Sequence, residues 1–317
     1  MTSGMSGIAI AVSFAAGAIG CERTAAEKPT PAVPIPTDVA LPVSSATQEP
    51  DPGALLLVLS PTVLALWPER KMIAVPPADA KLQGFAVGDK RVSRADYLVV
   101  PLHDALAARF GPDAARPEVL LAVDVSTPYR LFIEVFYTVG QSHPARVSLL
   151  VRSGAGQAVI DVVPQLSSAR GGLCRTEEDK RGREAVAAIL GAAAGTPIPT
   201  TEPSEAVPLP SNAPLCFSVV AAEKGFVVSA FGHELAPGCS AAAPRFAVAV
   251  PKRDGAFDFA QLSACAARMK ERASETDAVV YAKSGTDFQT VVSTMDAIRG
   301  KADGGSLFPS AAFGPSP

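Results

Sequence analysis

Residues 118–140, EVLLAVDVSTPYRLFIEVFYTVG, decide the fold, because residues 277–299, DAVVYAKSGTDFQTVVSTMDAIR, repeat their pattern without a gap. Each stretch begins with an acidic residue and an apolar run that has the length and composition of a buried strand. A short polar turn follows, and then apolar residues at i, i+3, i+4, i+7 and i+10, which form one stripe of an amphipathic helix. The sequence therefore predicts a strand–turn–helix unit that occurs twice.

The turn before each of the two helices carries a threonine, Thr127 in the first copy and Thr286 in the second. We expect both to be helix N-caps, because a hydroxyl at that position can accept a hydrogen bond from a free first-turn amide. Pro128 follows in the first copy, and proline suits the first helical position. The apolar stripes that we expect to be buried are Tyr129, Phe132, Ile133, Phe136 and Val139 in the first copy, and Phe288, Val291, Val292, Met295 and Ile298 in the second.

Further elements extend the repeat upstream. Phe259, Leu262, Ala266 and Met269 mark an earlier helix in the second copy, and Leu102, Leu106 and Phe110 mark its counterpart in the first. Paired apolar runs predict a hairpin at the start of each copy, at 55–67 and 216–231. The predicted fold class is therefore α+β, with two small tandem domains, each a mixed β-sheet with two helices packed on one face.

Two proline-rich stretches divide the chain of 317 residues. Residues 22–54 and 195–214 lack a sustained apolar period, and we expect both to be extended linkers. They leave two folded blocks, 55–194 and 215–317, which we assign to the first, more divergent domain and to the second.

The first 21 residues resemble an export signal with a lipobox. An uncharged apolar run at 7–20 is short for a membrane helix and has the length of a signal-peptide core. It ends at Ala18-Ile19-Gly20-Cys21, which resembles the site where Cys21 would become the lipidated N-terminus. A cleaved ordinary signal and a retained short anchor are the alternatives. Glu22 in place of the aspartate linked with inner-membrane retention favours the outer membrane, and the inner membrane remains open.

Four further cysteines remain in a chain that we expect to be exported, so disulfides are the natural prediction. We predict a Cys239–Cys265 bond, which would tie a Pro-Gly loop to the helix that follows it. Cys174 and Cys216 are then the second pair.

Catalytic, cofactor and metal sites are not indicated by the sequence. No GxSxG serine or phosphate-binding glycine loop is present, and the three histidines lie far apart. Asp124 follows a buried strand, where functional residues often lie, but its aligned residue is Lys283, so an exposed turn residue or local cap is the simpler interpretation. A formal charge of −3 without a basic tract gives no indication of a nucleic-acid partner. We expect a protein that is not an enzyme.

The repeated unit resembles the periplasmic domain of the ExbD/TolR family, the biopolymer-transport accessory proteins of proton-driven motors in the Gram-negative envelope. The second copy carries the resemblance in its strand 277–282, in Phe288 and in Met295-Asp296-Ala297-Ile298-Arg299, and Leu307-Phe308-Pro309 is similar to the family's ending. The first copy carries it at 119–139. The family has a transmembrane helix with a proton-handling aspartate, whereas the run at 7–20 has no acidic residue, and the family has one such domain per chain.

The resemblance therefore implies the binding half of that work. We expect a periplasmic lipoprotein, attached to the membrane by its lipid anchor, that binds peptidoglycan or a motor or energy-transducer protein. Because the family's domains are thought to act as dimers, the resemblance implies that the two copies pack as an intramolecular pseudo-dimer, and two independent domains are the alternative. A solute- or ligand-binding lipoprotein is the alternative, and a large apolar pocket with convergent polar groups between the two blocks would favour it.

Overall fold

The computed structural model describes residues 32–79, 84–91, 93, 96–111, 116–154, 156–164, 215–231, 233–243, 247–300 and 306–314. The chain divides into two compact units, Met1–Pro31 and Ala32–Pro317, and all described residues belong to the second. The predicted signal peptide with its lipobox therefore lies outside the described residues, as does the predicted linker at 195–214. Within the described residues, no helix has the length and apolar character needed to cross a membrane.

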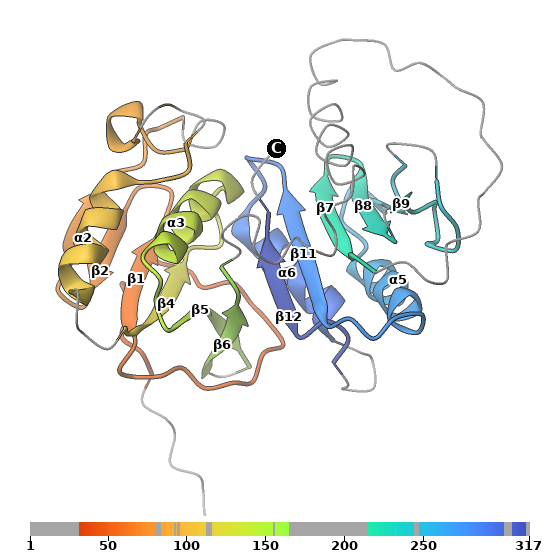
Figure 1. Cartoon of the computed structure of the whole chain (residues 1–317), viewed down its shortest axis with the longest axis horizontal. Coiled ribbons are helices and arrows are strands. Elements are labelled where there is room, and N and C mark those ends of the chain that lie inside the picture. The colour runs from red at the N-terminus through yellow and green to blue at the C-terminus, as the bar shows by residue number, and fades with distance from the viewer. Residues whose placement is uncertain are drawn as a thin grey trace, which may run out of the picture. The chain divides into compact units, whose positions relative to one another are not determined.

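The strands of the described residues form one mixed sheet, which confirms the α+β class (Figure 1). Its order is β10-β8-β7-β11-β12-β6-β5-β4-β1-β2-β3, and β9 pairs with β8 beside this path. We call the described residues before 165 the first half and those after 214 the second half. The strands of the first half are β1 (Leu55–Leu59), β2 (Leu64–Trp67), β3 (Lys71–Ala74), β4 (Glu118–Val123), β5 (Arg146–Ser153) and β6 (Gly156–Val162). Those of the second half are β7 (Ser218–Ala222), β8 (Gly225–Ala230), β9 (His233–Glu234), β10 (Val250–Pro251), β11 (Asp277–Ala282) and β12 (Ser310–Phe313).

The two halves of this sheet have the same topology. In the first half, β1 pairs antiparallel with β2 and parallel with β4, and β4 pairs parallel with β5. In the second half, β7 pairs antiparallel with β8 and parallel with β11, and β11 pairs parallel with β12. The edge strands also correspond, because β3 adds to β2 and β10 adds to β8, both antiparallel. The gapless alignment of 118–140 with 277–299 thus corresponds to a repeat of strand order and direction.

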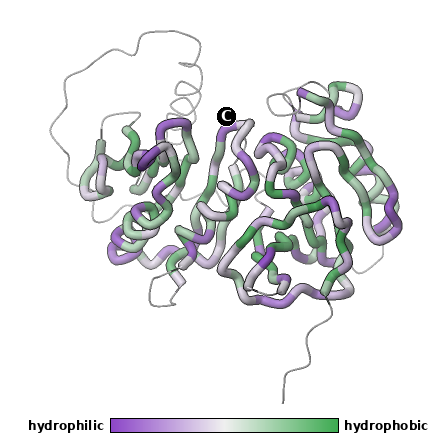
Figure 2. Tube along the Cα trace, turned by 180° about the vertical axis from the view of Figure 1, so that it is seen from behind, coloured by the Kyte–Doolittle hydropathy of each residue, from purple (hydrophilic) through white to green (hydrophobic). Residues whose placement is uncertain are grey.

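The α-helices of the described residues are α2 (Val100–Phe110), α3 (Tyr129–Gln141), α5 (Phe259–Lys270) and α6 (Phe288–Arg299), and a 3-10 turn, η1, spans Val87–Asp89. The predicted apolar stripes of all four helices are buried, apart from the partly buried Phe259 at the start of α5. Figure 1 shows α2 and α3 in front of the first-half strands, and α6 behind β11 and β12. The longer apolar stretches of the chain, green in Figure 2, run largely through these strands and helices.

The predicted helix caps are wrong by one residue. The N-cap of α6 is Asp287, whose carboxylate accepts a hydrogen bond from the Thr290 amide at 2.8 Å. The N-cap of α3 is Pro128, which has no side-chain acceptor. Thr127 is fully buried instead, and its hydroxyl donates a hydrogen bond to the Leu59 carbonyl of β1 at 3.5 Å. The turn is one residue longer than the pattern suggested, so a carboxylate in the second copy takes the place predicted for the hydroxyl.

Residues 32–54 differ from the free linker that their proline content predicted. They are extended, but the segment 33–48, which we call the strap, packs on the sheet and on α6. Val39 and Leu41 are buried among alternate side chains of the first-half strands, on the face away from α3: Leu56, Val58, Leu120, Ala122, Leu150 and Val159. The strap therefore belongs to the folded unit and covers apolar surface that would otherwise face water.

Candidate functional site

The two halves meet through equivalent residues at the starts of α3 and α6. Pro128 and Asp287, which the sequence alignment equates, form an antiparallel bridge. The Arg130 amide donates to the Ser284 carbonyl at 3.0 Å, and the Gln289 amide donates to the Val125 carbonyl at 3.2 Å. These two bonds join equivalent positions of the repeat in a reciprocal way, which is the pattern of a two-fold contact.

Aromatic side chains fill this junction. Phe132 of α3 lies 4.6 Å from Phe288 of α6 and 4.9 Å from Phe313 of β12, measured between ring centroids. The fully buried Tyr129 hydroxyl donates to the Gly314 carbonyl at 2.7 Å and lies 3.2 Å from the Val280 carbonyl. Burial raises the pKa of Tyr129 well above its usual value, so its hydroxyl remains a donor. The junction is therefore built like a protein interior.

The strap crosses this junction and is held mainly through its backbone. Beyond the point where β4 stops pairing with β5, Arg152 of β5 donates its amide to the Pro42 carbonyl at 2.8 Å and accepts from the Ser44 amide at 3.0 Å. The strap therefore continues the sheet in the manner of an added strand. Further along, the Val159 amide of β6 donates to the Gln48 carbonyl at 2.8 Å.

Two glutamine side chains bind the strap in the same two-way manner. The Gln289 carbonyl oxygen accepts from the Val43 amide at 2.8 Å, and its NH₂ group donates to the Val43 carbonyl at 3.1 Å. Gln157 repeats this pair with the backbone of Val33, at 2.6 and 2.9 Å. A primary amide offers one acceptor and two donors, so it can satisfy an extended residue as a neighbouring strand would.

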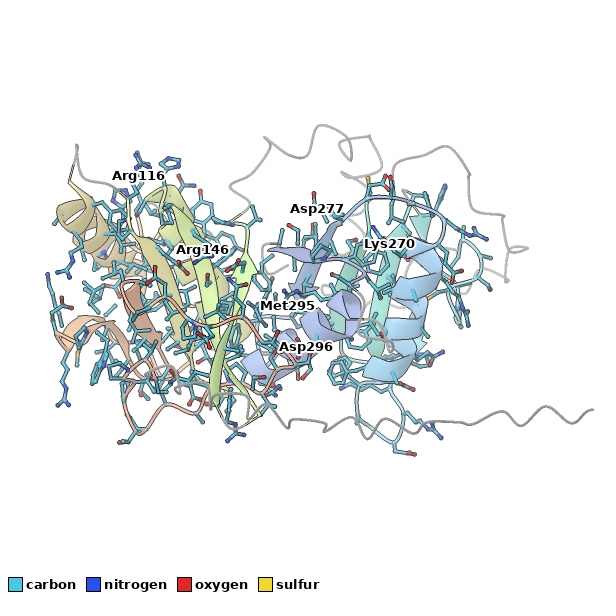
Figure 3. The ribbon with its side chains drawn as sticks, turned by 90° about the horizontal axis from the view of Figure 1, so that it is seen from below. Arg116, Arg146, Lys270, Asp277, Met295 and Asp296 are labelled. Carbon is cyan, nitrogen blue, oxygen red and sulfur yellow. A yellow bond between two sulfur atoms is a disulfide. The ribbon has the colours of Figure 1, made fainter. Side chains whose placement is uncertain are left out.

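Two carboxylates complete the contact, one from each half. Asp124 accepts the Ala40 amide at 2.8 Å, and its other oxygen accepts the Ser126 amide at 2.9 Å. Asp296 of α6 accepts the Ser44 hydroxyl at 2.8 Å and the Ser45 amide at 3.1 Å (Figure 3). Burial raises the pKa of Asp296, while its hydrogen bonds with Ser44 and Ser45 oppose that shift. The Val125 amide also donates to the Ala40 carbonyl of the strap at 2.8 Å. We call Asp124, Val125, Arg152, Gln289 and Asp296 the strap-binding surface.

This geometry decides between the two interpretations of Asp124. It caps its own turn, as predicted, but it is only 7% exposed because the strap covers it. The prediction that it is an exposed turn residue is therefore wrong.

A buried group of charges lies on α3. Glu134 is fully buried and contacts the Lys90 ammonium, the Arg130 Nε at 2.7 Å and the Phe85 amide at 2.8 Å. Lys90 is also fully buried, and this burial lowers its pKa. Gly84 has φ +71°, and a Cβ there would collide with the Glu134 carboxylate, so this approach requires glycine. The group fastens the segment before α2 onto α3.

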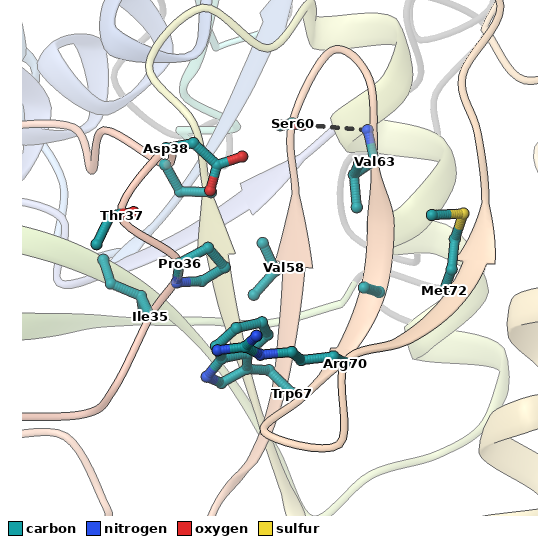
Figure 4. Close-up of a pocket in the computed structure, with 12 residues that line it drawn as sticks. Ile35, Pro36, Thr37, Asp38, Val58, Ser60, Val63, Trp67, Arg70 and Met72 are labelled. Atoms are coloured by element: carbon teal, nitrogen blue, oxygen red, sulfur yellow. Dashed lines mark hydrogen bonds between the residues drawn. The ribbon is translucent and has the colours of Figure 1, made fainter.

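A pocket of about 400 Å³ lies between strap residues 35–39 and the strands β1, β2 and β3 (Figure 4). Trp67 and Arg70 lie in its wall, with the guanidinium 4.9 Å from the indole ring centroid. A second hollow of about 420 Å³ lies between the halves, beside β6 and β12. Its charged side chains, Arg146 and Asp161, form an ion pair at 3.7 Å.

The cysteine predictions fall in part on described residues. The structure joins Cys239 and Cys265 by a disulfide, with their Cα atoms 5.5 Å apart. Cys216 is disulfide-bonded as well. Cys174, which the sequence analysis paired with it, and the predicted lipidation site Cys21 lie outside the described residues. The described residues contain no cluster of histidine, cysteine or carboxylate side chains suited to a metal ion.

The sequence did not indicate that any residue of the strap-binding surface would bind the strap. Gln289 and Asp296 lie on the polar side of a predicted amphipathic helix, where such residues are ordinary. Comparison with family models, with curated proteins and with solved structures finds no match for this chain.

Proposed function

We propose that this chain is an exported envelope lipoprotein built from two tandem ExbD/TolR-like domains, each with two helices on one face of its sheet. It would act in the periplasm, with its lipid anchor in the outer or the inner membrane. Its work would be to bind peptidoglycan or a motor or energy-transducer protein, without catalysis. The two domains would pack as an intramolecular pseudo-dimer.

The strap is the observation that carries this proposal. It follows the N-terminal region directly, and hydrogen bonds fasten it both to the first half, at Asp124 and Arg152, and to the second half, at Gln289 and Asp296. An anchor upstream of the strap would therefore hold both halves at once. The equivalent contacts across the junction support the pseudo-dimer in the same way.

The anchor is tested by Cys21→Ser. The variant should leave the membrane fraction and lose fatty-acid labelling, because it lacks the thiol that would carry the lipid. The double variant Cys239→Ser/Cys265→Ser is the control and should keep the label. A wild-type protein that takes up no label contradicts the anchor.

The partner is tested by sedimentation of the mature protein with purified peptidoglycan and by crosslinking in the cell envelope. We expect retention in the pellet or a crosslinked motor protein. Failure of both assays rejects the binding role.

The pocket beside Trp67 favours one second candidate, a ligand-binding lipoprotein. A volume of about 400 Å³ is within the range for small-molecule sites. Against it, the pocket lies within the first half and opens to solvent, and the charged pair in the hollow between the halves is already satisfied. Native mass spectrometry of the protein purified from its own envelope separates the two candidates, since a retained small molecule would favour this one.

A further inference from the structure

The strap has the properties of a bound peptide. Its hydrogen bonds with the fold come mainly from its backbone, at positions 33, 40, 42–45 and 48, and from few side chains. Two apolar side chains, Val39 and Leu41, enter the apolar cluster, and the Ser44 hydroxyl reaches Asp296. Val43 points away and is 47% exposed. A surface that binds mainly through backbone hydrogen bonds accepts any extended segment whose side chains fit at the few positions where side chains are buried or hydrogen-bonded.

Those positions define a short pattern. Residues 39 and 41 must be apolar, and position 44 supplies a hydroxyl. Position 42 is buried and forms its hydrogen bond through the carbonyl, so it accepts proline, which has no amide hydrogen. Proline also keeps the segment extended before it binds, which lowers the entropy lost on binding. The pattern is apolar-x-apolar-Pro-x-Ser/Thr.

The strap is also suited to release. It buries few large apolar side chains, and ordering an extended segment costs conformational entropy that offsets this gain. It joins β1 through a turn whose residues Asp51, Pro52 and Gly53 are exposed. Nothing in this turn has to unfold for the strap to leave.

We propose that the strap-binding surface is a recognition site for an extended, proline-containing segment of a partner protein, and that the strap is the chain's own occupant of that site. The partner's segment would carry the pattern apolar-x-apolar-Pro-x-Ser/Thr and would replace the strap. This inference deepens the proposed function, because it gives the chemistry of the protein partner. It does not depend on lipidation or on peptidoglycan, and those assays can fail while this one succeeds.

The test separates the strap from the fold without altering either. A recognition sequence for a site-specific protease is inserted between Pro52 and Gly53 of the full mature chain, and the chain is then cut. The probe is a fluorescent peptide with the sequence of residues 33–48, VPIPTDVALPVSSATQ. We expect it to replace the cut strap and raise the anisotropy, whereas the uncut protein should not bind it.

Variants of the peptide and of the surface test the pattern. A peptide with Leu41→Asp should bind at least tenfold more weakly, because a carboxylate would enter the apolar cluster. A peptide with Ala40→Thr and Val43→Thr should bind within about threefold of the parent, since both side chains are exposed. Asp296→Asn in the cut protein should weaken binding about tenfold through the loss of charge-assisted hydrogen bonds. Asp277→Asn, at an exposed residue that Figure 3 shows apart from Asp296, is the matched control and should change nothing.

Several outcomes would overturn the proposal. One is a cut protein that keeps its far-UV circular dichroism but does not exchange its strap for the probe. Another is a protein that unfolds when the strap leaves, which would make the strap an integral part of the fold. A third is a site that binds the parent peptide but not the peptide with Ala40→Thr and Val43→Thr, because recognition would then not follow the proposed pattern. If the uncut protein is a dimer that the probe dissociates, the occupant is the strap of a second copy, and the proposal for a partner protein is wrong.

Discussion

The outward faces of α3 and α6 are equivalent in the repeat, and each is covered by another segment of the chain. On α3 this segment contains the short 3-10 turn η1, whereas on α6 it is the extended strap. On α3, Arg130 and Glu134 hold the segment that leads into α2, through Phe85 and Lys90. On α6, the aligned residues are Gln289 and Ser293, and Gln289 holds the strap. The same helix face is therefore buried in both copies, but by segments that are not equivalent in the repeat.

The two segments that cover α3 and α6 are held by different kinds of contact, and they also differ in how far along the chain they lie from the helix they cover. The first segment lies within the first half of the sheet and is fixed by buried charges, which are costly unless every charged group is paired. The strap reaches α6 from a remote part of the sequence and is fixed to that helix by one neutral amide side chain, Gln289, and one partly buried carboxylate, Asp296. The first arrangement suits a permanent contact, and the second suits one that is exchanged.

The largest expected effect comes from breaking the charged cover on α3. Glu134→Gln should lower the free energy of unfolding by ~3–5 kcal/mol, because it leaves the buried Lys90 without its counter-charge. Ser293→Ala, at the aligned position of α6, is the control and should cost less than about 1 kcal/mol. Urea unfolding followed by circular dichroism measures both.

A double replacement sharpens this first prediction. Lys90→Met combined with Glu134→Met removes the fully buried ion pair and should cost less than Glu134→Gln alone, because the remaining cation, Arg130, is 12% exposed and keeps its contact with the Tyr97 ring. Equal costs for Glu134→Gln and Ser293→Ala would show that the two covers do not differ energetically.

The sequence predicted the repeated elements well because their signal is local. The apolar periods of 118–140 and 277–299 predicted β4, α3, β11 and α6, and the structure confirms all four. The strap was interpreted as a linker because prolines interrupt its period, and its partners Gln289 and Asp296 lie 246 to 252 residues away. Glu134 could not be recognised either, since burial of a glutamate depends on Lys90 and Gly84, far from it in sequence.

The disulfide gives the second comparison, because residues 55–162 contain no cysteine while the second half contains the Cys239–Cys265 bond. Cys239→Ser with Cys265→Ser should lower the free energy of unfolding by about 2–4 kcal/mol, since the closed loop restricts the unfolded chain. Urea unfolding of the oxidised protein against this variant measures it. Peptide mapping of the non-reduced protein that finds no 239–265 link would contradict the prediction.

Tyr129→Phe tests the junction by making its two sides alike, because the residue aligned with Tyr129 is Phe288. The variant removes the donor to the Gly314 carbonyl, and we expect a loss of about 1–2 kcal/mol. The Val280 carbonyl keeps a bond from the Gly314 amide, which limits the cost. Tyr137→Phe is the control, at the partly buried tyrosine of α3 that contacts the Tyr97 ring. A larger loss for Tyr137→Phe would show that the junction hydroxyl contributes little.

The smallest effect concerns the starts of the two helices, where only α6 has a side-chain cap. Asp287→Ala should cost about 1 kcal/mol, because the Thr290 amide loses its acceptor and the carboxylate no longer faces the positive end of the helix. Asp287→Asn keeps an acceptor oxygen and should cost only a few tenths of a kcal/mol, so it separates the hydrogen bond from the charge. Thr286→Ala decides between this structure and the cap predicted from the sequence. If its loss exceeds that of Asp287→Ala in the same urea titration, the threonine is the true cap, and the start of α6 then matches the pattern that the repeat first suggested.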